Sequence, residues 1–170
     1  MKSRRPIPIT DEPFPLFPKM IATSFGAGFL PVAPGTWGAL VGIVMWLPLY
    51  LWCPGTPAYI ATVALTLFFT VAGTWASTVS EKYWGKDPVA ACVDETVGQL
   101  ISLLPLCGGP KVAPWWLIIV SLALFRLFDI FKPLGIRSME RFPGGFGMMA
   151  DDILAAIYAA IIVEAVMLSI

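Results

Sequence analysis

The chain has 170 residues, a formal net charge of zero, 58% hydrophobic residues and only 13% charged residues. A soluble domain usually carries about 25% charged residues, so a bilayer is the expected solvent. The neutral balance and the lack of a basic tract argue against nucleic acid as a partner, and the length fits one domain. No pattern in the chain specifies an oligomeric state.

Residues 1–19 are predicted to form a Pro-rich cytoplasmic arm, and residues 20–170 a single membrane domain. A signal peptide needs an apolar run soon after its basic residues. Here the basic residues Lys2, Arg4 and Arg5 are followed by closely spaced prolines instead. The arm is therefore expected to be irregular and not to act as a signal peptide.

Five apolar segments follow, at residues 39–51, 58–79, 97–106, 112–131 and 153–170. They predict an all-α, integral-membrane helical bundle with about four to five membrane helices. A helix needs about 20 residues to cross the hydrocarbon core, and the second, fourth and fifth segments meet or approach that length. The first segment is short and contains a proline, and the third is shorter still and ends near one. Both are expected to be tilted, re-entrant or interfacial.

The distribution of charge predicts which segments face the cytoplasm. Basic residues in the arm place the start of the chain there if all five segments cross. Residues 24–38, the loop 80–95 and the loop 132–152 then share the cytoplasmic face, while the turn 105–114 lies outside. We therefore expect a multi-pass protein of the cell inner membrane with one polar site facing the cytoplasm. A re-entrant third segment would change the later part of this topology.

The first motif is the glycine-rich stretch 24–38. Its glycines allow backbone N–H groups to approach an anion, and a helix starting near Thr36 would point its positive end the same way. Gly35 and Thr36 are therefore candidates for contacting a phosphate, with Thr36 also expected to cap the helix. The alternative is a tight turn at the membrane interface whose glycines serve helix packing.

Two pairs of acids precede apolar segments. Asp94 and Glu95 stand before the third segment, where acids also favour a helix N-terminus. Asp151 and Asp152 follow a glycine-rich stretch that is expected to be a flexible loop leading to the start of the last helix. One Asp would suffice as a cap there, so the second favours cation binding.

A third charged group surrounds the end of the fourth segment. Arg126 and Asp129 are three residues apart and share a helical face, while Pro133 should end the helix at Lys132. The alternative reading is an internal ion pair that neutralises two intramembrane charges. An ion pair does not require Lys132, so the complete group favours a site for phosphate and metal.

The chemistry of these residues narrows the reaction. Oxygen ligands in a chain without histidine suit Mg²⁺ or Mn²⁺ better than zinc. The absence of histidine excludes a phosphohistidine intermediate, and no cysteine is followed by five residues and an arginine. Attack by a metal-activated water remains the simplest route. Two rivals stay open: a small cation transporter or channel using the same carboxylates, and a non-catalytic membrane scaffold.

Four stretches in this order resemble the phosphatidylglycerophosphatase A family, over Phe25 to about Ala160. Small departures are Ala39, where serine is frequent, Leu134 after the Lys-Pro pair, and Ala150 before the Asp pair. The matching stretches are Phe25-Gly26-Ala27-Gly28 with Pro31 and Pro34-Gly35-Thr36-Trp37-Gly38; Asp94-Glu95 with Val97-Gly98; Phe125-Arg126 with Asp129 and Lys132-Pro133; and Gly144-Gly145, Gly147-Met148-Met149 and Asp151-Asp152.

The resemblance implies an Mg²⁺-dependent membrane phosphatase that converts phosphatidylglycerophosphate to phosphatidylglycerol and phosphate in phospholipid biosynthesis. A membrane phospholipid is the expected substrate. The expected substrate-binding residues are Thr36, Gly35, Arg126 and Lys132. The expected metal-binding and catalytic residues, one of which would act as general base, are Asp94, Glu95, Asp129, Asp151 and Asp152.

Overall fold

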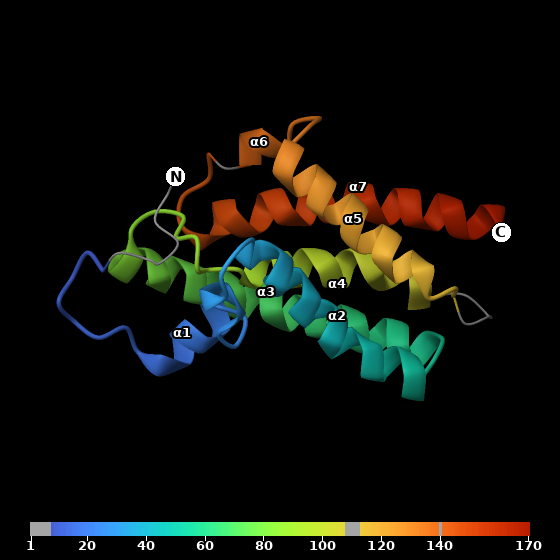
Figure 1. Ribbon diagram of the computed structural model, residues 1–170, viewed down its shortest axis with the longest axis horizontal. Coiled ribbons are helices and arrows are strands. Elements are labelled where there is room, and N and C mark those ends of the chain that lie inside the picture. The colour runs from blue at the N-terminus through green and yellow to red at the C-terminus, as the bar shows by residue number, and fades with distance from the viewer. Residues whose placement is uncertain (1–7, 108–112, 140) are drawn as a thin grey trace.

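The computed structural model describes residues 8–107, 113–139 and 141–170, and these ranges form helices and connecting turns without strands (Figure 1). The elements in chain order are α1 (Leu16–Ala22), η1 (Ala27–Phe29), α2 (Pro34–Trp52), α3 (Thr56–Trp84), α4 (Val93–Cys107), α5 (Trp116–Phe131), α6 (Ile136–Met139) and α7 (Gly145–Ser169).

Three helices are long and apolar enough to cross a membrane: α2, α3 and α7, with 19, 29 and 25 residues. They confirm the class of helical membrane protein. The expectation that the first segment is short was wrong, because α2 begins at Pro34, five residues before the predicted start, and continues through Pro48 to Trp52. A proline removes only one intrahelical hydrogen bond, and neighbouring helices can support the remaining turn.

The helices α4 and α5 have 15 and 16 residues, below the roughly 20 that a full span needs. The fourth segment was expected to approach full length, but α5 begins only at Trp116, and part of the predicted segment lies outside the described residues. The central helix α4 packs against α2, α3, α5 and α7. Because protein surrounds it, its length need not match the thickness of the bilayer.

The five longer helices alternate in direction along the bundle. The starts of α2, α4 and α7 therefore meet the ends of α3 and α5 at one end, where residues from all five line a common cavity or its rim. Figure 1 shows the opposite end, with the C-terminus and the turn between α2 and α3. This alternation gathers residues far apart in sequence.

Small residues let the helices approach closely, as is common in membrane bundles. At Gly42 of α2, an added Cβ would lie 2.8 Å from the Thr96 carbonyl oxygen of α4. At Gly98 of α4, an added Cβ would overlap the Phe125 ring of α5. These close approaches seat α2 and α5 directly against α4.

The N-terminal arm packs against the end of α3. The Phe14 ring stacks on Tyr83 with centroids 4.7 Å apart, and the Ile9 N–H donates to the Tyr83 carbonyl at 2.9 Å. The arm was expected to be irregular up to residue 19, but α1 already begins at Leu16. Its exposed Leu16 and Phe17 give this end of the bundle an apolar surface.

Candidate active site

A cavity of about 610 Å³ lies at the end of the bundle where α2, α4 and α7 begin. It collects eight of the nine residues predicted from the sequence, and Thr36 is the exception. The predicted residues that line it are Gly35, Asp94, Glu95, Arg126, Asp129, Lys132, Asp151 and Asp152.

Three of the predicted carboxylates form a compact cluster. One carboxylate oxygen each from Asp94, Glu95 and Asp152 lies within 4.8 Å of the others. Asp94 and Asp152 are buried, and Glu95 is nearly so. Asp94 Oδ1, Glu95 Oε2 and Asp152 Oδ2 have no hydrogen-bond partner among the described residues. Buried carboxylate oxygens are costly unless they are compensated, so this cluster could hold a metal ion.

The two acid pairs reach the cluster from different helical positions. Asp94 and Glu95 occupy the first turn of α4, as their sequence context predicted. Asp151 and Asp152 lie two turns inside α7, which begins at Gly145, so the expected flexible loop and capping role were wrong. The helix starts early because Gly145 packs closely on α3 and its N–H donates to the Thr78 hydroxyl at 3.0 Å.

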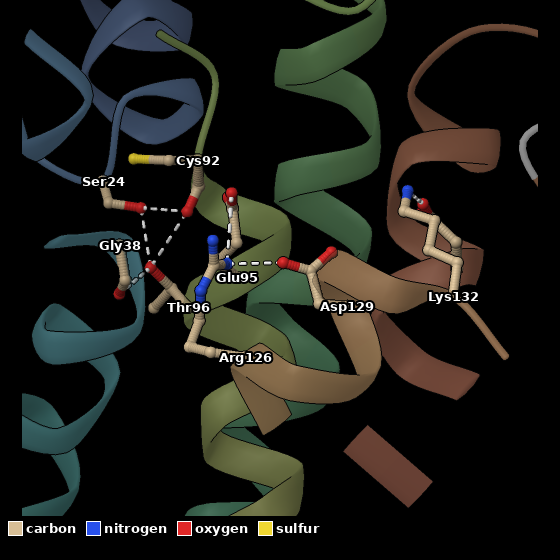
Figure 2. Close-up of polar contacts among 9 residues, drawn as sticks. Ser24, Gly38, Cys92, Glu95, Thr96, Arg126, Asp129 and Lys132 are labelled. Carbon is tan, nitrogen blue, oxygen red and sulfur yellow. Dashed lines mark hydrogen bonds and ion pairs between the residues drawn. The ribbon is translucent and has the colours of Figure 1, made fainter. Parts of the chain in front are cut away.

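Arg126 lies between the acid cluster and Asp129 (Figure 2). Its Nη1 is 2.6 Å from Asp129 Oδ2 and 3.7 Å from Glu95 Oε1. The internal ion pair considered as an alternative is therefore formed. It holds the guanidinium beside the cluster and leaves Asp129 outside the group of three, while the metal-binding role of Asp129 stays a prediction.

Lys132 supplies a second cation on the far side of Asp129. The helix α5 ends at Phe131, as Pro133 predicted, and Lys132 takes a left-handed conformation with φ of 47°. This turn directs the side chain to α7, where Nζ forms an ion pair with Asp151 Oδ2. Each cation of the site is thus paired with an acid that lies next to the cluster.

The glycine-rich stretch approaches the site mainly through Gly35. A Cβ added there would overlap the Glu95 carboxylate and lie 2.8 Å from Arg126 Nη1. The predicted cap at Thr36 was wrong, because α2 begins at Pro34 and Thr36 makes no side-chain capping bond. Proline suits the first helical position, since its ring presets the backbone and no N–H is lost there.

A hydroxyl network next to Glu95 escaped the sequence analysis. Ser24 Oγ donates to the Cys92 carbonyl at 3.0 Å and lies 2.7 Å from Thr96 Oγ1. Thr96 Oγ1 donates to the Gly38 carbonyl at 2.8 Å, as Figure 2 shows. The network joins the turn after α1 to α2 and α4. Small hydroxyl residues inside two motifs were its only signal in the sequence.

Burial sets the protonation chemistry at the start of α4. It raises the pKa of Asp94, with the neighbouring Glu95 charge adding to the rise, and it also raises the pKa of Glu95. Both acids therefore favour either a proton or a compensating cation. Burial raises the pKa of the Cys92 thiol to about 12, so this thiol stays protonated and is a poor nucleophile at neutral pH.

The fold and the cavity define a helical membrane protein whose clustered carboxylates, arginine and lysine suit phosphate chemistry. These features are those of a membrane phosphatase. The family model for phosphatidylglycerophosphatase A matches residues 20–167, and the chain belongs to this family. The resemblance of the four motifs is thereby confirmed, and the chain is a phosphatase.

Three relatives carry phosphatase names, and two of them are named for this family. A Bacteroides thetaiotaomicron protein named "Putative phosphatidylinositol-3-phosphatase" is 48% identical over 147 residues, covering 86% of this chain and 91% of the relative. Phosphatidylglycerophosphatase A of Haemophilus influenzae is 38% identical, covering 86% of each chain. That of Escherichia coli is 31% identical, covering 83% of this chain and 78% of its own. No solved structure matches the chain.

Proposed function

We propose that this phosphatase removes the terminal phosphate of phosphatidylglycerophosphate in an Mg²⁺-dependent reaction, yielding phosphatidylglycerol for phospholipid biosynthesis. The observation that carries the proposal is the buried group of Asp94, Glu95 and Asp152, with unpartnered oxygens, beside two cations. A dianionic phosphate and a hard cation together would compensate this arrangement. The family and two of its named relatives support the choice of lipid.

The donor atoms fit magnesium. Asp94, Glu95 and Asp152 offer only oxygen ligands, and magnesium usually binds to one or two carboxylates together with substrate phosphate. When bound, the ion would stabilise charge on the phosphoryl oxygens and make a water molecule more acidic. Asp129 and Asp151 were predicted from the sequence as further metal ligands; we propose that they act chiefly in positioning, because each forms an ion pair with a cation of the site.

Arg126 and Lys132 would bind the phosphate oxygens. The Arg126 side chain is only 17% exposed, and its guanidinium presents a planar set of donors, which suits a phosphate. In hydrolysis a water oxygen bonds to phosphorus, the phosphorus–oxygen bond to the glycerol breaks, and the leaving oxygen takes a proton. The two cations would offset the negative charge that develops on the phosphoryl group. One of the carboxylates would accept the proton from water.

We propose that the cavity faces the cytoplasm from the inner membrane. All lysine and arginine residues within the described ranges lie at the cavity end of the bundle, and cytoplasmic loops are enriched in such residues. They are Lys19, Lys82, Lys86, Arg126, Lys132, Arg137 and Arg141. Acyl chains could then stay in the bilayer while the headgroup reaches the carboxylates.

A second candidate substrate is phosphatidylinositol 3-phosphate. The specific observation is the 48% identity to the Bacteroides relative, which exceeds the 38% and 31% identity to the Haemophilus and Escherichia phosphatidylglycerophosphatases. Both lipids present a phosphomonoester on an anionic headgroup, so the same residues could bind either. They differ in the group that leaves, a primary glycerol oxygen or a ring oxygen of inositol.

The test is phosphate release by the purified protein in detergent from each lipid, with Mg²⁺ and then with excess EDTA. We expect release from phosphatidylglycerophosphate that needs Mg²⁺ and exceeds release from phosphatidylinositol 3-phosphate in kcat/KM. The opposite order would replace the first substrate by the second. Release that persists in EDTA would contradict the metal assignment.

A further inference from the structure

Two exposed aliphatic residues adopt a left-handed backbone conformation beside the cavity. Val32 has φ of 66° and Leu134 has φ of 52°, with 65% and 77% of their surfaces exposed. The left-handed region is unfavourable for side chains of this kind, especially for β-branched valine, whereas glycine or asparagine adopts it readily. In water, an aliphatic residue would stabilise neither turn, because its backbone conformation is unfavourable and its side chain would be exposed to solvent.

Both turns are held by an aromatic side chain. Trp37 Nε1 donates a hydrogen bond to the Val32 carbonyl oxygen at 3.1 Å. The Tyr158 hydroxyl donates to the Leu134 carbonyl oxygen, also at 3.1 Å. In two separate loops, a hydrogen bond from an aromatic side chain therefore holds the backbone of an exposed aliphatic residue. Strained backbone that is held in this way tends to occur at functional sites.

The two turns border the cavity on different sides. Ala33, which follows Val32, and Lys132, two residues before Leu134, both line it. Figure 2 shows α2, at Gly38, and Lys132 on opposite sides of Arg126 and Asp129.

The height of Val32 in the membrane follows from α2. This candidate span has 19 residues and is therefore about 28 Å long, close to the roughly 30 Å of the hydrocarbon core. Val32 lies two residues before its start, so a span that matches the hydrocarbon core would place it at the level where hydrocarbon meets headgroups. Exposed Leu30 and Phe131 extend the apolar surface at this rim.

We propose that Val32 and Leu134 are two tips that insert into an anionic lipid leaflet, so that the substrate phosphate enters the cavity between them from the bilayer. The proposal deepens the proposed function and rests on it. The occupant of this surface is a leaflet because the tips adjoin the start of α2 and the end of α5, where the exposed side chains Trp37 and Phe131 are also apolar. It is an anionic leaflet because Arg137 and Arg141 follow Leu134 closely in the chain.

Spin-label accessibility tests the insertion without relying on activity. Labels are placed by Val32→Cys and Leu134→Cys in a Cys53→Ser background, since Cys53 is exposed while the other two cysteines are buried. The control is Asp87→Cys, an exposed position at the same end with φ of 51°. The protein is reconstituted in vesicles of phosphatidylcholine and phosphatidylglycerol.

We expect the labels at 32 and 134 to collide with dissolved oxygen and to be protected from a water-soluble nickel complex, with the reverse at 87. Equal exposure of all three labels to nickel would overturn the proposal. Protection that disappears on dilution of the protein in lipid would instead assign the tips to contact with a second copy, and would overturn it as well.

Activity provides a second measurement. Val32→Asn and Leu134→Asn keep a residue that tolerates the left-handed conformation but remove the aliphatic side chain. Loss of one buried aliphatic group corresponds to about a tenfold effect, so we expect about tenfold lower kcat/KM on long-chain lipid in vesicles. Activity on a water-soluble short-chain analogue should be unchanged, and Leu134→Met should resemble the wild type. Equal losses on both substrates would contradict lateral entry, whereas an inactive wild type would contradict only the proposed function.

Discussion

Replacing Gly35 by alanine should separate activity from stability. Gly35 lies in the first turn of α2, and an added Cβ would overlap the Glu95 carboxylate and lie 2.8 Å from Arg126 Nη1. Ordinary contact begins at 3.4 Å, so Arg126 must retreat by about 0.6 Å and Glu95 by more. Both obstacles are ends of flexible side chains, so the helix backbone can stay in place while the site is displaced.

The expected effect on catalysis is large. A displacement of about 1 Å in a catalytic site can cost about a hundredfold in rate, which corresponds to about 2.7 kcal/mol in the activation barrier. The free energy of unfolding should change little or increase, because alanine is favoured over glycine in a helix by up to about 1 kcal/mol. Phosphate release from phosphatidylglycerophosphate measures the first effect, and thermal unfolding in detergent measures the second.

Gly42→Ala is the matched control. Gly42 lies two turns further along the same helix, but its added Cβ would lie 2.8 Å from the backbone oxygen of Thr96, which cannot rotate away. This variant should lose stability, while its folded fraction retains more activity than Gly35→Ala. A folded Gly35→Ala protein with kcat within threefold of the wild type would refute the assignment of Glu95 and Arg126 to the site.

Three further predictions concern charge. Asp152→Asn should abolish Mg²⁺ activation while the protein stays folded, and an unchanged Mg²⁺ titration would remove Asp152 from the metal site. Lys132→Gln should raise KM about tenfold by losing a charged contact to phosphate, whereas Lys82→Gln, an exposed lysine at the same end, should not. Because burial raises the pKa of Asp94 and Glu95, the folded metal-free protein binds more protons than the unfolded chain between their ordinary and raised pKa values. Its stability in EDTA should therefore fall as pH rises through that window, while stabilisation by Mg²⁺ grows; a Tm that rises with pH in EDTA would contradict this.

Several features of the fold were predictable because they depend on local sequence. Long apolar runs form helices in lipid, since every backbone polar group must be satisfied within the segment. Pro133 ends α5 where its sterics require. The helix boundaries were less predictable. Pro48 does not end α2, and α7 begins at Gly145 because that glycine packs on α3, a contact with a residue far away in the chain.

Charge placement alone indicated that the polar residues share one end of the bundle, because charges avoid hydrocarbon and must gather at its edge. Only the tertiary structure decided how these residues are paired. It brings Asp152 to Asp94 and Glu95, and it joins Lys132 to Asp151. It also forms the hydroxyl contact between Ser24 and Thr96. These pairings depend on the rotation and close approach of helices that are distant in sequence, and a linear pattern does not encode that geometry.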